Sequence, residues 1–227
     1  MTTLVEIPAL GCDAGLYEPF NAALGLDTQV IVAVANRMAM CAGQILSNAP
    51  DEFFLLGTSF GGRVAMETAV RAPDRVKALI IIGAGPGGVA DPSAGLRRSE
   101  RVRGAEFEMV LKEMGDIVSH LPGPHGPSTM EAFREMSRKC GAERFALQSD
   151  AMAHRIDLLP QLKKIACPVL CLWGEHDQYS PAETAHTIAA AVPHGRSVIM
   201  KDCGHFPTLE YPRDAANVVS GFLSLAH

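Results

Sequence analysis

The stretch GTSFGG at positions 57–62 comes directly after the apolar run FFLL at 53–56. Three glycines surround one serine at the point where a hydrophobic strand would end. A plain tight turn would explain the glycines, because glycine lets backbone segments pass close to one another. A strand-to-helix turn that exposes Ser59 as a nucleophile would explain the serine too, since residues 57–61 match G-x-S-x-G. The pattern is short, so the other parts of the chain must decide between the two interpretations.

Length, composition and charge narrow the class of protein. A chain of 227 residues with 48% hydrophobic and 20% charged residues is typical of one soluble globular domain. Its net charge of −5 argues against a nucleic-acid partner. No uncharged apolar run reaches the roughly 18 residues of a membrane span, and no secretory signal is evident. We therefore expect a cytoplasmic protein that binds neither nucleic acid nor membrane.

The six cysteines, at positions 12, 41, 140, 167, 171 and 203, have no framework spacing. We expect free thiols, as in a reducing cytosol. Cys167 and Cys171 lie in one predicted strand, where four residues span roughly 13 Å, so they cannot share a metal ion. No other group of histidine, cysteine and carboxylate residues has metal-ligand spacing, and we predict neither a metal nor another cofactor.

Short apolar runs alternate with segments of helical periodicity. The runs at 4–10, 29–35, 53–56, 78–83, 169–173 and 197–200 are apolar throughout, as in strands covered on both faces. Helices are predicted at 17–24, 36–48, 60–71, 181–191 and 213–226. This alternation predicts an open, mostly parallel sheet of about six strands with helices on both faces. The stretch 89–164 has no convincing strand and is predicted to be a helical insertion.

A nucleophilic serine needs a base and a group that orients the base, and both candidates follow later strands. Asp177 comes just after the strand at 169–173, and His205 comes just after the strand at 197–200. Their order in the chain, serine, acid and histidine, is the order of one particular fold. Glu175 and Asp202 are nearby acids that compete with Asp177 for the role.

At this point the chain resembles the α/β-hydrolase family over nearly its whole length. GTSFGG resembles the nucleophile elbow, LWGEHD the strand end that supplies the acid, and DCGHFPTLEYP the histidine loop. The resemblance implies an α/β-hydrolase core at 1–88 and 165–227, with a helical cap at 89–164. Because the chain starts at what would be the third strand of the family, we expect about six strands rather than eight.

The resemblance also implies the role of each residue. Ser59 would attack an acyl carbon, His205 would take its proton, and Asp177 would orient the imidazole. The segment IPALGCDAGLYEPF resembles the oxyanion loop, with Leu10-Gly11 where the family usually has His-Gly. This alignment puts the backbone N–H groups of Cys12 and Phe60 at the developing oxyanion.

The predicted function is hydrolysis of a small carboxylic ester, thioester, lactone or related acyl compound through an acyl-enzyme. The same residues could serve a carbon–carbon bond hydrolase or a perhydrolase, and the fold could also serve a ligand-binding protein without catalysis. No partner is expected besides the small acyl substrate and, at most, a second copy of the chain in a homodimer. Apolar side chains of the insertion should line the substrate site: Phe107, Met109, Met114, Phe133, Met136, Phe145 and Met152.

One further set of residues leaves two interpretations open. Arg97, Arg98, Arg101 and Arg103 lie in one predicted helix of the insertion. They could recognise a substrate carboxylate, but a solvated helix face is the commoner arrangement of such a run.

Overall fold

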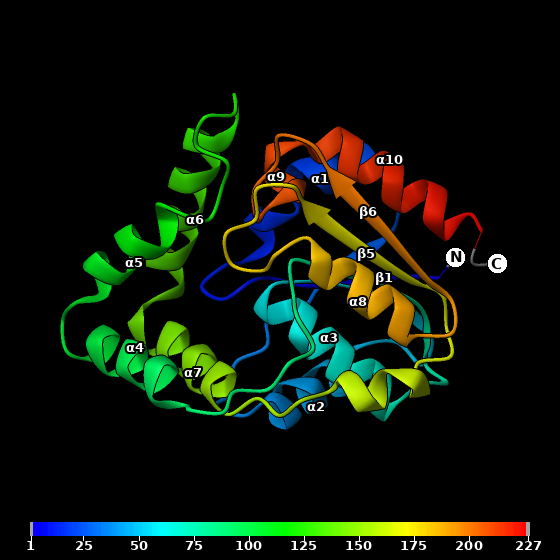
Figure 1. Cartoon of the computed structure of the whole chain (residues 1–227), viewed down its shortest axis with the longest axis horizontal. Helices are drawn as coiled ribbons and strands as arrows, with labels where there is room; N and C mark the ends of the chain where they lie inside the picture. The colour runs from blue at the N-terminus through cyan, green and yellow to red at the C-terminus, as the bar shows by residue number, and fades with distance from the viewer. Residues whose placement is uncertain (1, 226–227) are drawn as a thin grey trace.

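The computed structural model describes residues 2–225 and is built around an open six-stranded sheet (Figure 1). The strands have the order β2-β1-β3-β4-β5-β6, and every neighbouring pair is parallel. The predicted fold class is therefore confirmed. The strands are β1 (Leu4–Ile7), β2 (Thr28–Val30), β3 (Phe53–Thr58), β4 (Val76–Ile82), β5 (Val169–Gly174) and β6 (Gly195–Met200).

Helices cover both faces of the sheet (Figure 1). Helices α1 and α10 pack together on one face, and α2, α3 and α8 lie on the other. These helices are α1 (Glu18–Leu24), α2 (Met38–Asn48), α3 (Phe60–Arg71), α8 (Glu183–Ala191) and α10 (Pro212–Leu223), with the short α9 (Pro207–Glu210), η1 (Ala14–Leu16) and η2 (Leu159–Lys164). Within residues 2–225, no helix is long and apolar enough to cross a membrane.

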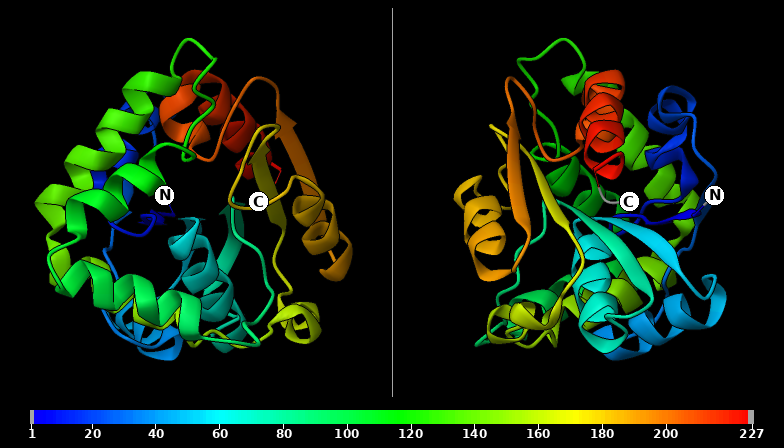
Figure 2. Two further views of the ribbon diagram at one scale, coloured as in Figure 1. Left: turned by 60° about the vertical axis from the view of Figure 1, so that its left-hand side comes forward. Right: turned by 90° about the vertical axis from the view of Figure 1, so that its right-hand side faces the viewer.

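Four further helices, here called the cap helices, lie together beside the sheet (Figure 2). They are α4 (Ser93–Arg103), α5 (Phe107–Gly115), α6 (Gly126–Cys140) and α7 (Ala142–Ala153). The arrows of β5 and β6 point toward the side that the cap helices occupy (Figure 1). The stretch 89–164 contains helices and no strand. Its exact limits as a separate domain stay a prediction.

Two predicted strands are shorter in the structure, and each has a local cause. β1 ends at Ile7 because Pro8 has no N–H to continue the hydrogen-bonded ladder. β2 ends at Val30, beside the end of its neighbouring strand β1, and the side chain of Gln44 binds both backbone polar groups of Val34 farther along the chain. Gln44 accepts the Val34 N–H at 2.8 Å and donates to the Val34 carbonyl at 2.9 Å. A side chain thus replaces a neighbouring strand there.

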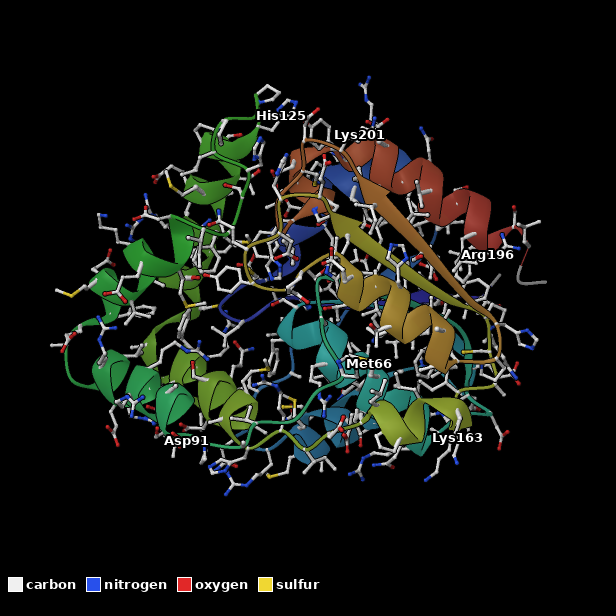
Figure 3. All side chains as sticks on the ribbon, viewed as in Figure 1. Met66, Asp91, His125, Lys163, Arg196 and Lys201 are labelled. Atoms are coloured by element: carbon white, nitrogen blue, oxygen red, sulfur yellow. The ribbon has the colours of Figure 1, made fainter. Side chains whose placement is uncertain are left out.

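Helix α3 lies in the interior, directly after the end of β3. All its residues from Phe60 to Ala69 are buried, and Met66 of this helix is labelled in Figure 3. Apolar strands on one side and other helices around it bury this helix almost completely, which fixes the position of its first residue. The six cysteines are all free thiols, as predicted.

Candidate active site

Ser59 lies in the sharp turn between β3 and α3. Its backbone has φ 56° and ψ −115°, a conformation that side-chain-bearing residues rarely adopt and that agrees with the strained strand-to-helix turn expected for a G-x-S-x-G motif. The Ser59 N–H donates to the Ile82 carbonyl at 2.7 Å, which holds the turn against β4. A Cβ atom on Gly61 would lie 1.9 Å from the Ile7 carbonyl oxygen, so only glycine fits there. The glycine therefore allows α3 to begin against the end of β1.

His205 and Asp177 meet at the ends of β6 and β5. The distance between His205 Nδ1 and Asp177 Oδ2 is 2.7 Å, and the two side chains are only 2% and 1% exposed. Asp177 Oδ1 accepts the N–H groups of Tyr179 at 2.8 Å and Ser180 at 3.0 Å. Every oxygen of the carboxylate therefore has a partner, and the second imidazole nitrogen, Nε2, is left for another group.

The contact between the two side chains depends on space left by β4. Gly83 follows this strand with φ +59°, and a Cβ atom there would lie 2.8 Å from the His205 ring and 3.0 Å from Asp177 Oδ2. Glycine is thus required both by the backbone conformation and by the close approach of the pair. The rings of Tyr179 and Phe206 flank the imidazole, with centroids 4.9 and 5.3 Å away.

The two competing acids lie elsewhere. Glu175 and Asp202 are exposed, and the Asp202 N–H donates weakly to Glu175 at 3.4 Å. Asp202 instead lies near His120 and His176, with one ligand atom from each of the three within 4.8 Å of the others. The sequence spacing gave no sign of this potential metal-binding group. The two imidazole rings are stacked, with centroids 4.0 Å apart and planes 15° apart. Their in-plane lone pairs do not converge on one point in this arrangement.

Two cavities open beside Ser59. The smaller, of about 80 Å³, is lined by Ser59 and His205 and by mainly apolar side chains, which include Met114, Phe133 and Met152 of the cap helices. The larger, of about 670 Å³, extends from Ser59 along the loop at 83–89. Three of the seven cap side chains that we expected thus reach the smaller cavity. The prediction that Met109 lines the substrate site is wrong. Its side chain lies on the outer face of α5 and is 54% exposed.

The oxyanion prediction for Cys12 is wrong. The Cys12 N–H donates to the Ala9 carbonyl at 3.0 Å and closes a turn, so it is not free to bind an oxyanion. Burial raises the pKa of its thiol well above the ordinary value, which also removes the side chain from acid–base chemistry. Leu10, two residues earlier, lines the smaller cavity with Ser59, and its N–H has no hydrogen-bond partner among residues 2–225.

Phe60 is the first residue of α3 and lies in the wall of the smaller cavity. The first N–H groups of a helix have no partner within the helix. In residues 2–225 none accepts a hydrogen bond from the Phe60 N–H. Together with Leu10, it gives the cavity two unpaired backbone donors from different segments.

Glu210 is a residue that sequence reasoning missed. It is 1% exposed, and its carboxylate accepts the N–H groups of Gly204 at 3.0 Å and Phe206 at 3.4 Å, on either side of His205. It also accepts the N–H of His120, from the connection between α5 and α6, at 2.9 Å. Burial raises the pKa of this carboxyl group, against the effect of these donors. The sequence signal was the single acid of the segment PTLE at 207–210, within DCGHFPTLEYP and five residues after His205.

Comparison with known proteins identifies the family. The model of the alpha/beta hydrolase family matches residues 5–218, which is nearly the whole chain. The chain belongs to the α/β hydrolase family, as the elbow and the strand-end residues predicted.

Individual relatives and structures are similar at lower identity. Monoacylglycerol lipase ABHD6 of Rattus norvegicus is 28% identical in an alignment 199 positions long that covers 77% of this chain and 56% of the lipase. Pimeloyl-(acyl-carrier protein) methyl ester esterase of Aliivibrio salmonicida (strain LFI1238) is 27% identical in an alignment 190 positions long that covers 79% of this chain and 72% of the esterase. The chain therefore spans between about half and three quarters of these relatives.

A solved structure agrees with the whole architecture. A thermophilic esterase from Thermogutta terrifontis superposes with a TM-score of 0.90 and 24% identity, covering 100% of this chain and 91% of that one. At this identity, the likeness concerns the fold.

Proposed function

We propose that this protein is a serine hydrolase of small carboxylic esters, with Ser59 as nucleophile, His205 as general base and Asp177 as the group that orients the base. The observation that carries the proposal is the buried pair of Asp177 and His205 at 2.7 Å, with His205 and Ser59, on its strained turn, both in the wall of one cavity. Sealed from water, the carboxylate holds the imidazole in one tautomer and stabilises its charged form. The ester activities named for the lipase and esterase relatives agree with this proposal.

The reaction would proceed in two steps. His205 Nε2 accepts the Ser59 proton as Oγ attacks the ester carbonyl, and the imidazolium then gives that proton to the departing alcohol. Water, activated by the same imidazole, releases the acid from the acyl-enzyme. The N–H groups of Leu10 and Phe60 would bind the oxyanion in both steps, and the positive end of the α3 dipole adds to the stabilisation.

A burst experiment tests the proposal. Mixed with p-nitrophenyl butyrate, the protein should release p-nitrophenol in a first phase equal to the enzyme concentration, followed by slower turnover. Ser59→Ala should abolish the burst and lower turnover at least about thousandfold. The matched control is Ser128→Ala, because Ser128 is exposed on α6 and its hydroxyl donates only to the His125 carbonyl.

The alternatives give different results. A non-catalytic binding protein would show neither burst nor turnover, and its Ser59→Ala variant would behave as the parent does. An enzyme restricted to carbon–carbon bonds would show no turnover of esters, yet Ser59 would still react with a fluorophosphonate probe. Ester turnover that persists in Ser59→Ala would remove Ser59 from the mechanism.

A further inference from the structure

The four arginines of α4 have different surroundings. Arg101 pairs with Glu106 at 2.8 Å and with Glu113 at 2.7 Å on the outer surface. Arg103 pairs with Glu143 at 3.2 Å and with Asp150 at 3.0 Å. These two arginines therefore have the solvated-face role that is common for such runs.

Arg97 is also exposed, and its guanidinium donates to the Ser93 hydroxyl at 2.9 Å on its own helix. Arg97, Arg101 and Arg103 therefore all lie on the outer surface of α4.

Arg98 is different, because it lies on the walls of both cavities that contain Ser59. Its Nε donates to the buried hydroxyl of Ser149 on α7 at 3.1 Å, which fixes the direction of the guanidinium. In residues 2–225, its two terminal nitrogens have no hydrogen-bond partner and no carboxylate lies within 4.0 Å of them. The two terminal nitrogens of the guanidinium group are thus held in a fixed direction and have no partner among the described residues.

The charges around Arg98 leave this cation without compensation. Burial holds the pKa of the Arg98 guanidinium below its usual range, and the groups that act on it electrostatically are the Tyr179 hydroxyl and the guanidinium of Arg155. Neither carries a negative charge at neutral pH. A partly buried cation without an anion is unfavourable, so an anionic ligand would gain binding free energy at this position.

The other charged residues on the cavity walls are already bound. Arg63 donates to the carbonyls of Pro86 and Ile156, and Arg155 donates to the carbonyls of Gly87 and Met152. These two arginines hold loops together.

Asp91 is the one acid on the walls of the larger cavity within the described residues. It is exposed, accepts the N–H and the hydroxyl of Ser93, and lies at the edge of the molecule in Figure 3. It therefore does not neutralise Arg98.

We propose that Arg98 binds a carboxylate of the substrate, so that the preferred substrates are half-esters of short dicarboxylic acids. This inference rests on the proposed function, because it places the ester carbonyl at Ser59 and the free carboxylate at Arg98 across one cavity. A planar guanidinium fork matches the two oxygens of a carboxylate. The apolar lining of the smaller cavity, with Met114, Phe133 and Phe206, suits the methylenes that separate the two ends of such a molecule.

A kinetic comparison tests the substrate class. The monomethyl esters of succinate, glutarate and adipate are compared with methyl butanoate, pentanoate and hexanoate, which replace the carboxylate by a methyl group at equal acyl length. The wild type should favour at least one half-ester over its neutral partner by about tenfold or more in kcat/KM. Arg98→Met should lower this preference about tenfold to hundredfold, mainly through KM, since a charge-assisted pair is lost.

Arg97→Met is the matched control, because it removes the same side chain from the outer face of the same helix and should keep the preference. If wild-type enzyme hydrolyses neutral esters better than all three half-esters, the proposal is overturned. It is also overturned if Arg98→Met slows both kinds of ester by the same factor, since the loss of the Ser149 bond alone would do that. If the methionine variant does not fold, Arg98→Lys replaces it. Lysine keeps the charge without the fork and should lower the preference at least about threefold.

A binding measurement separates this inference from the proposed function. Calorimetry on Ser59→Ala should detect glutarate but not the neutral glutaramide. The addition of Arg98→Met should weaken glutarate binding at least about tenfold. If the wild type hydrolyses no ester, the proposed function fails, while this measurement still reports on Arg98. Equal binding of glutarate with and without Arg98 would overturn the anion site while leaving ester hydrolysis intact.

Discussion

Asp177 and Glu113 are both acids that bind a basic side chain, but they do so in opposite surroundings. Asp177, at the end of β5, is 1% exposed and has partners for both oxygens, two of them backbone N–H groups. Glu113, on cap helix α5, is 53% exposed and pairs with Arg101, which is 34% exposed. Polar groups of the sheet are thus fixed by the backbone, whereas most of those of the cap helices are fixed only by one another.

This difference indicates that the strand ends of the sheet and the cap helices have different roles. Chemistry that needs sub-ångström placement lies where strands and loops supply the hydrogen bonds. Recognition can lie on cap side chains, where a single inward residue such as Arg98 changes the character of a cavity without disturbing the sheet. The comparison predicts large effects for substitutions at the strand ends and small effects for those on the outer face of the cap helices.

The largest effect is expected for Asp177→Asn. An amide cannot hold the imidazole in the tautomer that leaves Nε2 free to accept the serine proton, so kcat should fall about thousandfold or more. Steady-state kinetics with p-nitrophenyl butyrate measure the loss. Asp202→Asn is the control and should stay within about threefold, because Asp202 is exposed and lies away from His205. A greater loss in the Asp202 variant would reverse the assignment of the acid.

Gly61→Ala should damage the fold more than the chemistry. The added methyl would lie 1.9 Å from the Ile7 carbonyl oxygen, so β1 and α3 must separate. We expect the free energy of unfolding in urea to fall by about 3 kcal/mol or more. Gly43→Ala is the control, since a Cβ there meets nothing within 4 Å and alanine favours the helix by about 1 kcal/mol. Equal stability of the two variants would contradict the close approach.

Glu6→Gln tests a buried acid of β1. Asn21 donates to one oxygen of Glu6 at 2.8 Å, and burial raises the pKa of this carboxyl group from 4.5 to about 7. Since the folded state holds the proton more tightly, the resulting stability is fully present below pH 4.5 and is lost as the pH rises through about 7. The variant should therefore gain about 2 to 3 kcal/mol of unfolding free energy, relative to wild type, between pH 5 and pH 8.

The control for this experiment is Glu18→Gln, because Glu18 is exposed on α1, the helix that also carries Asn21. Its stability difference from wild type should be nearly the same at both pH values. A difference for Glu6→Gln that does not change with pH would show that Glu6 is ionised throughout.

The smallest effect is expected on the outer face of the cap helices. Arg101→Met removes the ion pairs with Glu106 and Glu113, yet exposed pairs contribute little. The melting temperature should change by less than about 3 °C, and kcat/KM for a neutral ester by less than about twofold. A fall of 10 °C or more would show that the surface pairs of the cap helices hold the domain together.

Much of the sheet could be predicted from the sequence, because each strand is a short apolar run that is covered on both faces. The run at 53–56 predicted β3. Ser59, Asp177 and His205 could be placed at strand ends because each follows a predicted strand within a few residues. The end of β2 could not be predicted, because β2 is an edge strand paired with β1, which ends at Ile7, and Val34 beyond it bonds to the side chain of Gln44 instead of to a strand.

The oxyanion loop and the cap helices were harder to predict, for physical reasons. The alignment put Cys12 at the oxyanion, but the turn bond from Cys12 to Ala9 decides which N–H stays free, and a short turn has no periodicity to reveal it. In α4 the arginines lie on neighbouring positions, so the sequence did not show that Arg98 faces Ser149 while Arg101 faces Glu113. The direction in which each arginine side chain points is determined by tertiary packing.

The segment 118–120, between α5 and α6, has a consequence for any attempt to exchange the cap helices for those of another protein. The Val118 carbonyl accepts the backbone N–H of His205 at 3.1 Å, and the His120 N–H donates to Glu210 at 2.9 Å. A chimera that replaced residues 89–164 as one block would leave the amide of His205 and one oxygen of Glu210 without these partners. The insertion is therefore not an interchangeable module. A workable graft has to retain segment 118–120 as part of the recipient protein.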